Sequence, residues 1–501
     1  MTDQLTAAAI LRGGPADEFV AREDFPPLTH YIDGEFVPSY SDEVFTLVNP
    51  ATGENLVSVP NGTADDTDAA IAAAKAALPA WRRTTPKTRA ELLLKIADRI
   101  EASSGLFKRL EALNTGKPHP VADDDVSSTV DVFRFAAGAA RAFSEVGSAE
   151  YVEGHTSILV REPIGVVGAV VPWNYPLLMG AWKIAPILAA GNTLVVKPSE
   201  QTPLSLLKLV EVVGDLIPAG VLNVVLGTGP VVGERLSTSP DVDLVALTGS
   251  VRSGKAVATA AAGSLKRVHL ELGGKAPVVI LPDADLALAA EGVRTAGYWN
   301  AGQECGAGTR VLVHESVADR FTSLLADQVR TLKVGEPWAG DDVEIGPMIS
   351  EAHFGRVTAF LERAIADGAV PVVGGAPLPG PGFFIAPTVL ADVAPRSEAS
   401  QEEIFGPVVT IETFADTAEA IERANEVPYG LAASVWTRDA SDAIELPKQL
   451  DFGTVWVNAH LVIANEAPWG GFKGSGYGRD LSAYALQDYS RTKHVQINHS
   501  R

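Results

Sequence analysis

The chain has 501 residues, of which 46% are hydrophobic and 20% are charged, a composition typical of a globular protein with two or three domains. Its formal net charge of −22 argues against nucleic acid and anionic membrane surfaces as partners, because both require basic patches. No basic, apolar leader opens the chain, and three prolines and Lys183 interrupt the apolar stretch 164–196. We therefore expect a cytoplasmic protein with neither a signal peptide nor a membrane span.

The first predicted elements are helical. Residues 1–24 mix charged, polar and small side chains and are expected to form a loose extension. Apolar residues then recur at helical spacing in 68–78 and in 89–103, and Pro86 introduces the second helix. The apolar stretch 164–196 is interpreted as buried strand, loop and helix.

From residue 193 onward, strands and helices alternate. Short β-rich runs predict strands at 193–197, 221–226, 244–248, 268–272, 276–280 and 311–314. Helical spacing predicts helices at 203–216, 231–236, 254–262, 287–299 and 318–332. The alternation indicates βαβ units with parallel sheets, and a second α/β domain after residue 276. A functional site would then lie in the crevice between the two domains.

Two polar motifs adjoin predicted strands. Asn174 stands between Trp173 and Tyr175, and an Asn amide is a suitable donor to an oxyanion, although the same segment also reads as a turn. Lys197 and Glu200 follow the strand 193–197. They could contact the hydroxyls of a ribose, and the alternative is a pair of solvated loop charges.

Two glycine-containing motifs suggest a phosphate site. The run 227–233, with Gly229 and Gly233, resembles a dinucleotide fingerprint but has one residue too many before its third glycine. The run 248–254, with Ser250 and Gly254, follows a strand and opens a helix, whose N-terminus offers free N–H groups to a phosphate. The alternative for Ser250 is an ordinary helix N-cap.

Glu271 and Cys305 are the candidates for covalent chemistry. Glu271 precedes a glycine pair at a strand end, where it could act as a general base or form an ion pair with Lys275. Cys305 is the chain's single cysteine and lies among glycines. It cannot form an intramolecular disulfide and lacks partners for a cysteine-based metal site, so no metal is expected. The remaining possibilities are a nucleophile, a redox sensor and an inert buried residue.

Taken together and in this order, the motifs resemble those of the aldehyde dehydrogenase superfamily over about residues 30–495. The resemblance continues in Glu402-Glu403-Ile404-Phe405-Gly406-Pro407, in Trp456-Val457-Asn458 and in Pro468-Trp469-Gly470-Gly471-Phe472-Lys473. Within the superfamily, the stretches 130–135 and 153–157 are most similar to γ-aminobutyraldehyde dehydrogenases.

The resemblance implies an α/β fold with three parts. A Rossmann-type NAD-binding domain is expected at 1–144 and 164–274, and a catalytic domain at 275–473. A small β arm at 145–163 and 474–501 would pair a hairpin with the C-terminal strand near 493–498 and assemble a homotetramer or homodimer.

The resemblance also implies the residues of the site. Cys305 would be the nucleophile, Glu271 the general base, and Asn174 the oxyanion donor beside the Cys305 backbone N–H. The positions expected to bind NAD are Trp173, Lys197, Ser199, Glu200, Gly229, Gly233, Ser250, Gly254, Leu272, Glu403 and Phe405. The positions expected to line the aldehyde tunnel are Asp125, Tyr175, Met179, Trp182, His460, Glu466 and Trp469, with Asp124 as a further carboxylate.

The resemblance leads to two expectations of selectivity. NAD is expected to be preferred over NADP, because a 2′-phosphate would meet the Glu200 carboxylate, a repulsion that Arg252 could moderate. The implied aromatic and acidic lining favours a small ω-aminoaldehyde such as 4-aminobutanal. Betaine aldehyde and uncharged aldehydes are the alternatives.

Other reaction classes are less compatible with these residues. A CoA-acylating enzyme characteristically lacks the base, and a non-catalytic scaffold would have lost Cys305 or Glu271. Both residues are present. Glu304 departs from some family members, and a carboxylate beside the thiol would raise its pKa, which leaves the activation of Cys305 open.

Overall fold

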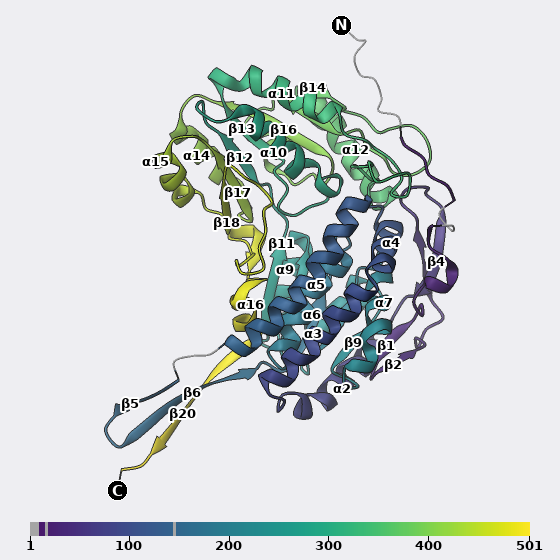
Figure 1. The fold of residues 1–501 in the computed structure, drawn as a ribbon, viewed down its shortest axis with the longest axis vertical. Coiled ribbons are helices and arrows are strands. Elements are labelled where there is room, and N and C mark those ends of the chain that lie inside the picture. The colour runs from purple at the N-terminus through teal and green to yellow at the C-terminus, as the bar shows by residue number, and fades with distance from the viewer. Residues whose placement is uncertain (1–9, 16–18, 144–146, 501) are drawn as a thin grey trace.

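The computed structural model describes residues 10–15, 19–143 and 147–500. Figure 1 shows two α/β units, one above the other, and a narrow β arm that projects away from them. Strand pairing within the described residues gives an eight-stranded, a seven-stranded, a three-stranded and a two-stranded sheet. None of the helices in these residues has the length and apolar character needed to span a bilayer.

The first unit is built on the eight-stranded sheet, in the order β19-β11-β10-β7-β8-β9-β1-β2. Its strands are β1 (His30–Ile32), β2 (Glu35–Val37), β7 (Val166–Val170), β8 (Thr193–Lys197), β9 (Leu222–Val224), β10 (Leu244–Gly249), β11 (Arg267–Leu272) and β19 (Gly476–Tyr477). The five strands from β11 to β9 run parallel. At the edges, β19 pairs antiparallel with β11, β1 antiparallel with β9, and β2 antiparallel with β1. After β7, the next two strands of the chain, β8 and β9, are added on one side of β7. The following strand, β10, is added on its other side. This reversal makes the carboxyl ends of β7 and β10 the expected ligand edge.

Helices cover this sheet. They are α2 (Ala64–Trp81), α3 (Pro86–Ala102), α4 (Ser104–Thr115), α5 (His119–Ala142), α6 (Pro176–Ala189), α7 (Leu204–Val213), α8 (Glu234–Thr238), α9 (Val251–Ala262) and α16 (Ser482–Asp488). Short turns are η1 (Arg22–Asp24), η2 (Gly214–Leu216) and the π-helical η3 (Gly229–Gly233). The helix starts follow local chemistry, because Thr63 and Asp66 form a capping box on α2, and Pro86 is the first residue of α3 after its cap Thr85.

The second unit contains the seven-stranded sheet, in the order β14-β15-β16-β13-β12-β17-β18. Its strands are β12 (Pro277–Ile280), β13 (Arg310–His314), β14 (Val370–Val373), β15 (Thr388–Ala391), β16 (Val408–Phe414), β17 (Ala432–Trp436) and β18 (Thr454–Val457). Only β14 is antiparallel among the described strands of this sheet. The helices are α10 (Leu286–Tyr298), α11 (Ala318–Arg330), α12 (Glu351–Ala366), α13 (Glu398–Gln401), α14 (Thr417–Asn425) and α15 (Ala440–Glu445). The turns are η4 (Trp299–Gly302), η5 (Glu315–Val317), η6 (Pro447–Gln449) and η7 (Lys473–Ser475).

The arm consists of β5 (Ser148–Val152), β6 (His155–Pro163) and β20 (Ser490–Asn498), in the order β20-β6-β5. A separate hairpin joins β3 (Val44–Val48) to β4 (Asn55–Pro60). The segment 476–488 was expected in the arm, but its strand β19 pairs with β11 and its helix α16 contacts α5 and α6. Without β19, the outer edge of β11 would have no strand partner. Residues 476–488 therefore belong to the first unit rather than to the arm. Residues 145, 146 and 501 of the expected arm lie outside the described residues.

The predicted elements agree closely with the observed ones. The strand predicted at 193–197 is β8, and the other predicted strands and helices each coincide with an observed element to within a few residues. The apolar stretch 164–196 is a strand, a loop, a buried helix and a second strand, as expected.

The expectation of a loose extension over 1–24 is wrong for the residues around Leu11. Leu11 forms a backbone bridge with Gly335, and Arg12 pairs with Glu336 at 2.8 Å. These contacts bind the segment to the second unit. Residues 1–9 and 16–18 lie outside the described part of the chain.

Candidate active site

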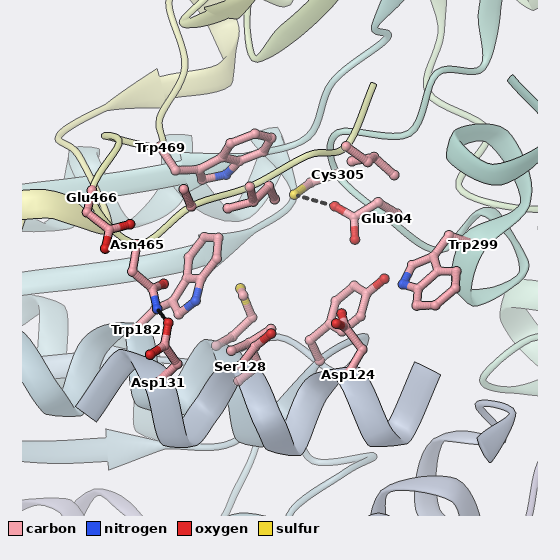
Figure 2. Close-up of a pocket in the computed structure, with 16 residues that line it drawn as sticks. Asp124, Ser128, Asp131, Trp182, Trp299, Glu304, Cys305, Asn465, Glu466 and Trp469 are labelled. Carbon is pink, nitrogen blue, oxygen red and sulfur yellow. Dashed lines mark hydrogen bonds between the residues drawn. The ribbon is translucent and has the colours of Figure 1, made fainter. Parts of the chain in front are cut away.

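Cys305 lies in the second unit, in the loop between η4 and β13. Its sulfur faces a cavity of about 390 Å³ (Figure 2). Three residues shortly before it, Asn300, Ala301 and Gly302, have left-handed backbones, with φ of 50°, 55° and 69°. A Cβ at Gly302 would stand 2.1 Å from the carbonyl oxygen of Gly406, so glycine is required there. The tight turn places Cys305 at the cavity wall.

Amide hydrogen bonds hold this turn. Asn174 follows β7 and donates through Nδ2 to the carbonyl of Gln303 at 3.1 Å. Asn300 donates to the carbonyl of Asn174 at 3.1 Å, and Gln303 accepts from the N–H of Ile349 at 2.9 Å. Asn174 is buried, and one N–H of its amide finds no acceptor among the described residues. The backbone N–H of Cys305 likewise has no partner within them. The turn that carries Cys305 therefore has two N–H donors without a partner among the described residues.

The thiol has an anionic environment. Burial raises the pKa of Cys305 well above its usual value, and the charges of Glu304 and Glu271 raise it further. The sulfur donates to Oε1 of Glu304 at 3.3 Å, the contact drawn between them in Figure 2. The thiol is therefore mostly protonated at neutral pH until a base or a ligand changes its surroundings.

Glu271 is the penultimate residue of β11 and is 2% exposed. Its Oε1 has no hydrogen-bond partner among the described residues. Burial raises the pKa of Glu271 well above its usual value, and the charge of Asp480 raises it further. The alternative of an ion pair with Lys275 is not realised in the described part of the chain, where the Lys275 Nζ is itself unpaired. A buried carboxyl with an open oxygen can take up a proton from water.

A charged cluster lies beneath Glu271. Lys183 on α6 pairs with Asp480 at 2.5 Å, and Asp480 pairs with Nε2 of His269 at 3.3 Å. The other ring nitrogen of His269 pairs with Asp488 at 3.3 Å. His269 and Glu271 are two residues apart on β11, so their side chains share one face of the sheet.

The cavity wall is acidic and aromatic. Its carboxylates come from Asp124 and Asp131 on α5, from Glu304 and from Glu466, and no Lys, Arg or His lines it among the described residues. The other lining residues are Ser128, Tyr175, Leu178, Met179, Trp182, Trp299, Leu461, Ile463, Ala464, Asn465 and Trp469. Asn465 donates to Asp131 at 2.6 Å, which joins the 461–469 loop to α5 (Figure 2).

Most residues expected at the tunnel line this cavity, but Asp125 and His460 do not. Tyr175, Met179, Trp182, Glu466 and Trp469 all line it. Asp125 is fully buried and pairs with the buried Lys117, because successive helical residues point about 100° apart and only its neighbour Asp124 faces the cavity.

His460 points away from the tunnel. Its ring nitrogens contact Ser434 Oγ and the Gly306 carbonyl, each at 2.8 Å, and these two contacts fix the ring. Burial lowers the pKa of His460 to about 4. It therefore braces, as a neutral ring, the backbone that follows Cys305.

Sequence reasoning missed several lining residues, including Ser128, Asp131, Trp299 and Asn465. A signal was available on α5, since Asp124, Ser128 and Asp131 follow the spacing i, i+4, i+7 that places side chains on one helix face. Figure 2 shows the three along one side of this helix.

The expected cofactor residues gather at the carboxyl edge of the first sheet. Trp173 follows β7, Lys197 ends β8, and Ser250 follows β10 and caps α9 by accepting from Ser253 N–H at 3.1 Å. Ser199 is buried just beyond β8. Lys197 donates to Glu200 at 2.8 Å, and although burial opposes it, this cation lowers the pKa of Glu200. Lys197 and Glu200 are therefore an ion pair rather than independent solvated charges. Ser250 is a helix N-cap, as the alternative interpretation held, and this does not exclude a role in binding a ligand.

Glycines shape the remainder of this edge. A Cβ at Gly254 would stand 2.5 Å from the side chain of Leu272, so α9 approaches β11 closely only because that position is glycine. Gly229 and Gly233 lie on η3, where a Cβ would meet nothing within 4 Å. Those two glycines are not required by crowding in this structure.

Phe405 and Glu403 meet the edge from the second unit. Glu403 accepts from the Gly274 N–H at 2.9 Å, and the Phe405 ring lies edge-on to Trp173 at 5.3 Å. Two residues of α12 hold this loop and were not expected from the sequence. His353 contacts the carbonyl of Phe405 at 2.7 Å, and Arg356 donates to the carbonyl of Ile404 at 2.6 Å.

The comparisons with known proteins agree in one family. The model of the Aldehyde dehydrogenase family matches residues 36–495. An aldehyde dehydrogenase of Aspergillus niger is 42% identical over 473 residues, covering 94% of this chain and 95% of that protein. A betaine aldehyde dehydrogenase of Bacillus subtilis (strain 168) is 39% identical over 478 residues, covering 94% of this chain and 97% of that protein. The crystal structure of a betaine aldehyde dehydrogenase of Staphylococcus aureus in complex with NAD+ matches with a TM-score of 0.93 at 38% identity, covering 98% and 97% of the two chains.

Proposed function

Because the chain belongs to the aldehyde dehydrogenase family, we propose that it oxidises an aldehyde to the carboxylic acid with NAD, using Cys305 as nucleophile, Glu271 as general base and Asn174 as oxyanion donor. The observation that carries this proposal is the position of the chain's only thiol. It faces a cavity, stands on a turn that the Asn174 amide holds, and feels the charge of the buried Glu271.

The first half-reaction is a covalent addition. The sulfur of Cys305 bonds to the aldehyde carbon, and the carbonyl oxygen becomes an oxyanion. We assign the free N–H of Asn174 and the backbone N–H of Cys305 as its donors, and the loss of one such donor typically costs about 10²–10³ in kcat. When bound, NAD supplies the acceptor for the hydride that leaves the former aldehyde carbon. The thioester on Cys305 then remains.

The second half-reaction is hydrolysis of the thioester. Glu271 takes a proton from water, the resulting hydroxide adds to the thioester carbon, and the sulfur leaves as the acid forms. Burial raises the pKa of Glu271, which makes its carboxylate a stronger base than an exposed glutamate. The presence of this carboxyl also favours transfer to water over transfer to CoA.

The carboxyl edge of the first sheet fits a dinucleotide. It offers the N-terminus of α9 for a phosphate and the Lys197–Glu200 pair for ribose hydroxyls. The Trp173, Phe405 and Glu403 side chains adjoin the same edge. We accordingly assign the expected NAD-binding residues to this edge and residues 275–473 to catalysis.

Glu200 supports a preference for NAD over NADP. Its carboxylate stays ionised beside Lys197, so a 2′-phosphate at the ribose would meet a negative charge. Arg252 is exposed on α9 and could offset part of this repulsion. We expect a lower kcat/KM with NADP than with NAD. In Glu200→Gln the difference between the two kcat/KM values should become smaller. Equal values for the two cofactors in the unaltered enzyme would contradict the preference.

The substrate class that we propose is a small ω-aminoaldehyde, with 4-aminobutanal as the best single candidate. Four carboxylates and no basic group line the described cavity, and such a lining concentrates cations at its mouth. The Trp182 and Trp469 rings lie edge to face at 6.4 Å. An indole face attracts an ammonium by about 0.5–2 kcal/mol, depending on desolvation.

Betaine aldehyde is the second candidate, because two of the relatives described above act on it by name. Its quaternary ammonium could use the same aromatic faces without donating to a carboxylate. Uncharged aldehydes remain the third candidate, for which the aromatic rings would serve as an apolar lining.

A substrate comparison tests these candidates. The rate of formation of reduced nicotinamide would give kcat/KM for 4-aminobutanal, betaine aldehyde and butanal. We expect 4-aminobutanal to lead, and Glu466→Gln or Asp124→Asn to raise its KM while leaving that of butanal near its starting value. Asp319→Asn, a carboxylate exposed on α11, is the control. If butanal equals or exceeds both cations, the aminoaldehyde assignment is wrong.

The arm supports a homo-oligomer, a tetramer or a dimer. Its apolar side chains Tyr151, Val152, Leu159, Val160, Val495 and Ile497 are exposed. Figure 1 shows the arm standing free of both units, and an exposed apolar sheet commonly marks an interface.

A cytoplasmic location also stays a proposal, to be tested by cell fractionation.

A further inference from the structure

Glu304 is the hydrogen-bond acceptor of the thiol that the proposed function makes the nucleophile. Its Oε1 accepts from Cys305 Sγ at 3.3 Å and from the Gly306 N–H at 3.1 Å. The backbone N–H anchors this oxygen, so the carboxylate is held at the sulfur rather than free to turn into solvent. These two hydrogen bonds fix the position of the Glu304 carboxylate next to the sulfur.

Glu304 also has a route to water. It lines the cavity together with Trp299 and Asp124, and Figure 2 shows its carboxylate directed into the space beside these two residues. A proton received by Glu304 could therefore pass to water in the cavity.

Glu271 is less suited to the same step. It acts on Cys305 only through its charge, with no hydrogen bond to the sulfur, and it is almost completely buried. Burial also raises its pKa well above the usual value. Without a contact to the sulfur, Glu271 is poorly placed to take the proton of the thiol, whereas its open oxygen remains available to water in the later step.

The thiol requires such an acceptor. Glu304, Glu271 and Glu403 all place negative charge near the sulfur, and no cationic side chain lines the described cavity to stabilise a thiolate. A free cysteine is only a few per cent thiolate at pH 7, and this environment reduces that fraction. Removing the proton while the new bond forms avoids the need for a preformed thiolate.

We propose that Glu304 accepts the proton of the Cys305 thiol as the sulfur adds to the aldehyde. The S–H bond breaks and the S–C bond forms. The carbonyl electron pair moves to the oxygen beside Asn174, and the proton resides on Glu304 until it leaves to water. This proton is the one that the overall oxidation releases, so no further reactant is needed. The inference rests on the proposed role of Cys305 and divides the acid–base work between two carboxylates.

Two other roles for Glu304 predict different behaviour. If it acted only as a repelling charge, its removal would lower the pKa of the thiol and make Cys305 more reactive at neutral pH. If it served only to bind a substrate ammonium, its removal would raise KM for cationic aldehydes and leave the thiol unchanged.

Labelling with iodoacetamide, a small neutral reagent, distinguishes these roles. Because the chain contains one cysteine, the mass added to the intact protein reports Cys305 alone. The labelling rate would be measured from about pH 6 to about pH 10, across the usual range of a thiol, in the unaltered protein, Glu304→Gln, Glu304→Asp and Asp124→Asn. Gln can still accept from the Gly306 N–H, and an unchanged thermal midpoint would verify that the fold is kept. Asp124→Asn removes a carboxylate of the same cavity that has no bond to the sulfur.

The expected result is that Glu304→Gln is labelled more slowly at neutral pH, by about tenfold to about 10²-fold. This loss lies at or below the lower limit of the rate enhancement that a general base typically provides, about 10²–10⁴-fold. The rates should converge at alkaline pH, where hydroxide removes the proton. Glu304→Asp should recover part of the rate, and Asp124→Asn should match the unaltered protein. The burst of reduced nicotinamide with aldehyde should slow in parallel in Glu304→Gln.

Faster labelling of Glu304→Gln at neutral pH, or an unchanged rate, would overturn the inference. A rise in KM for cationic aldehydes without a change in labelling would overturn it as well. Failure of the proposed function is a separate outcome, since it would show as continued aldehyde oxidation by Cys305→Ala, whatever Glu304 does.

Discussion

Cys305 combines two properties that rarely occur together in one side chain, because it is the proposed nucleophile and its surroundings hold it protonated. The proposed proton transfer to Glu304 would reconcile the two. Reactivity at this position therefore depends on its neighbours rather than on the thiol by itself.

Replacement of the nucleophile gives the first prediction. Cys305→Ala should lower aldehyde oxidation by at least about 10⁴-fold, because no other group can form the covalent intermediate. Its affinity for NAD, measured by fluorescence titration, should stay within about threefold, since the thiol contributes little to cofactor binding. Substantial formation of reduced nicotinamide by the variant would contradict the assignment.

Replacement of the base gives the second prediction. Glu271→Gln should still form the thioester but hydrolyse it slowly, because the amide cannot take a proton from water. Stopped-flow absorbance should show one equivalent of reduced nicotinamide formed rapidly, followed by a slow phase at least about 10²-fold below the original turnover. The raised pKa of Glu271 also predicts that turnover of the unaltered enzyme rises with pH as this carboxyl loses its proton, at a pH above the usual titration range of a glutamate. Turnover near the original value in Glu271→Gln would mean that another group activates water.

At the scale of elements, β11 links catalysis to a buried charge network. Glu271 and His269 share one face of the strand, and β19 carries the chain toward Asp480, which pairs with both Lys183 and His269. Burial and the charge of Lys183 oppose protonation of His269. Asp480 and Asp488 outweigh them, so the pKa of His269 is raised. The strand is therefore held most firmly when His269 is charged.

This arrangement predicts a pH-dependent stability. A raised folded-state pKa stabilises the fold fully below the unfolded value, near 6.5, and the contribution is lost as pH rises through the folded pKa. His269→Asn should therefore lower the thermal midpoint more at about pH 6 than at about pH 9. Each unit of pKa elevation is equivalent to about 1.4 kcal/mol. His494→Asn, exposed on β20, is the matched control, and an equal loss at both pH values would rule out charge on His269 as the cause.

At the scale of the whole molecule, the two α/β units and the arm make one working arrangement. The first unit supplies Glu271, Asn174 and the carboxyl edge, and the second supplies Cys305, Glu403 and Phe405. The site exists only where the units meet. The arm extends beyond both and presents apolar side chains outward (Figure 1).

The arm gives the last prediction. The double variant Val495→Lys with Ile497→Lys alters two exposed residues on one face of β20. If the arm forms the oligomer interface, the loss of two buried aliphatic side chains, each contributing about 1.5–3 kcal/mol, should weaken association by at least about tenfold. Light scattering over a dilution series should then show a smaller mass than the unaltered protein. Leu265→Lys, a 92% exposed control away from the arm, should not change the mass, and an unchanged mass in the double variant would place the interface elsewhere.

The sequence by itself determined whatever depends on short segments of chain. Period and turn chemistry are local, so β8, α3 and the βαβ alternation could be predicted, and the linear motifs around Asn174, Glu271 and Cys305 indicated the family and the chemistry proposed for the site. Only the tertiary structure decided which side chains meet. The rotation of α5 turns Asp124 and Asp131 into the cavity and Asp125 onto Lys117, and two hydrogen bonds turn His460 away. Lys183 and Asp480 lie 297 residues apart and meet because β19 pairs with β11. Even the contact between adjacent Glu304 and Cys305 depended on the left-handed turn before them and on the Gly306 N–H, which one-dimensional spacing does not specify.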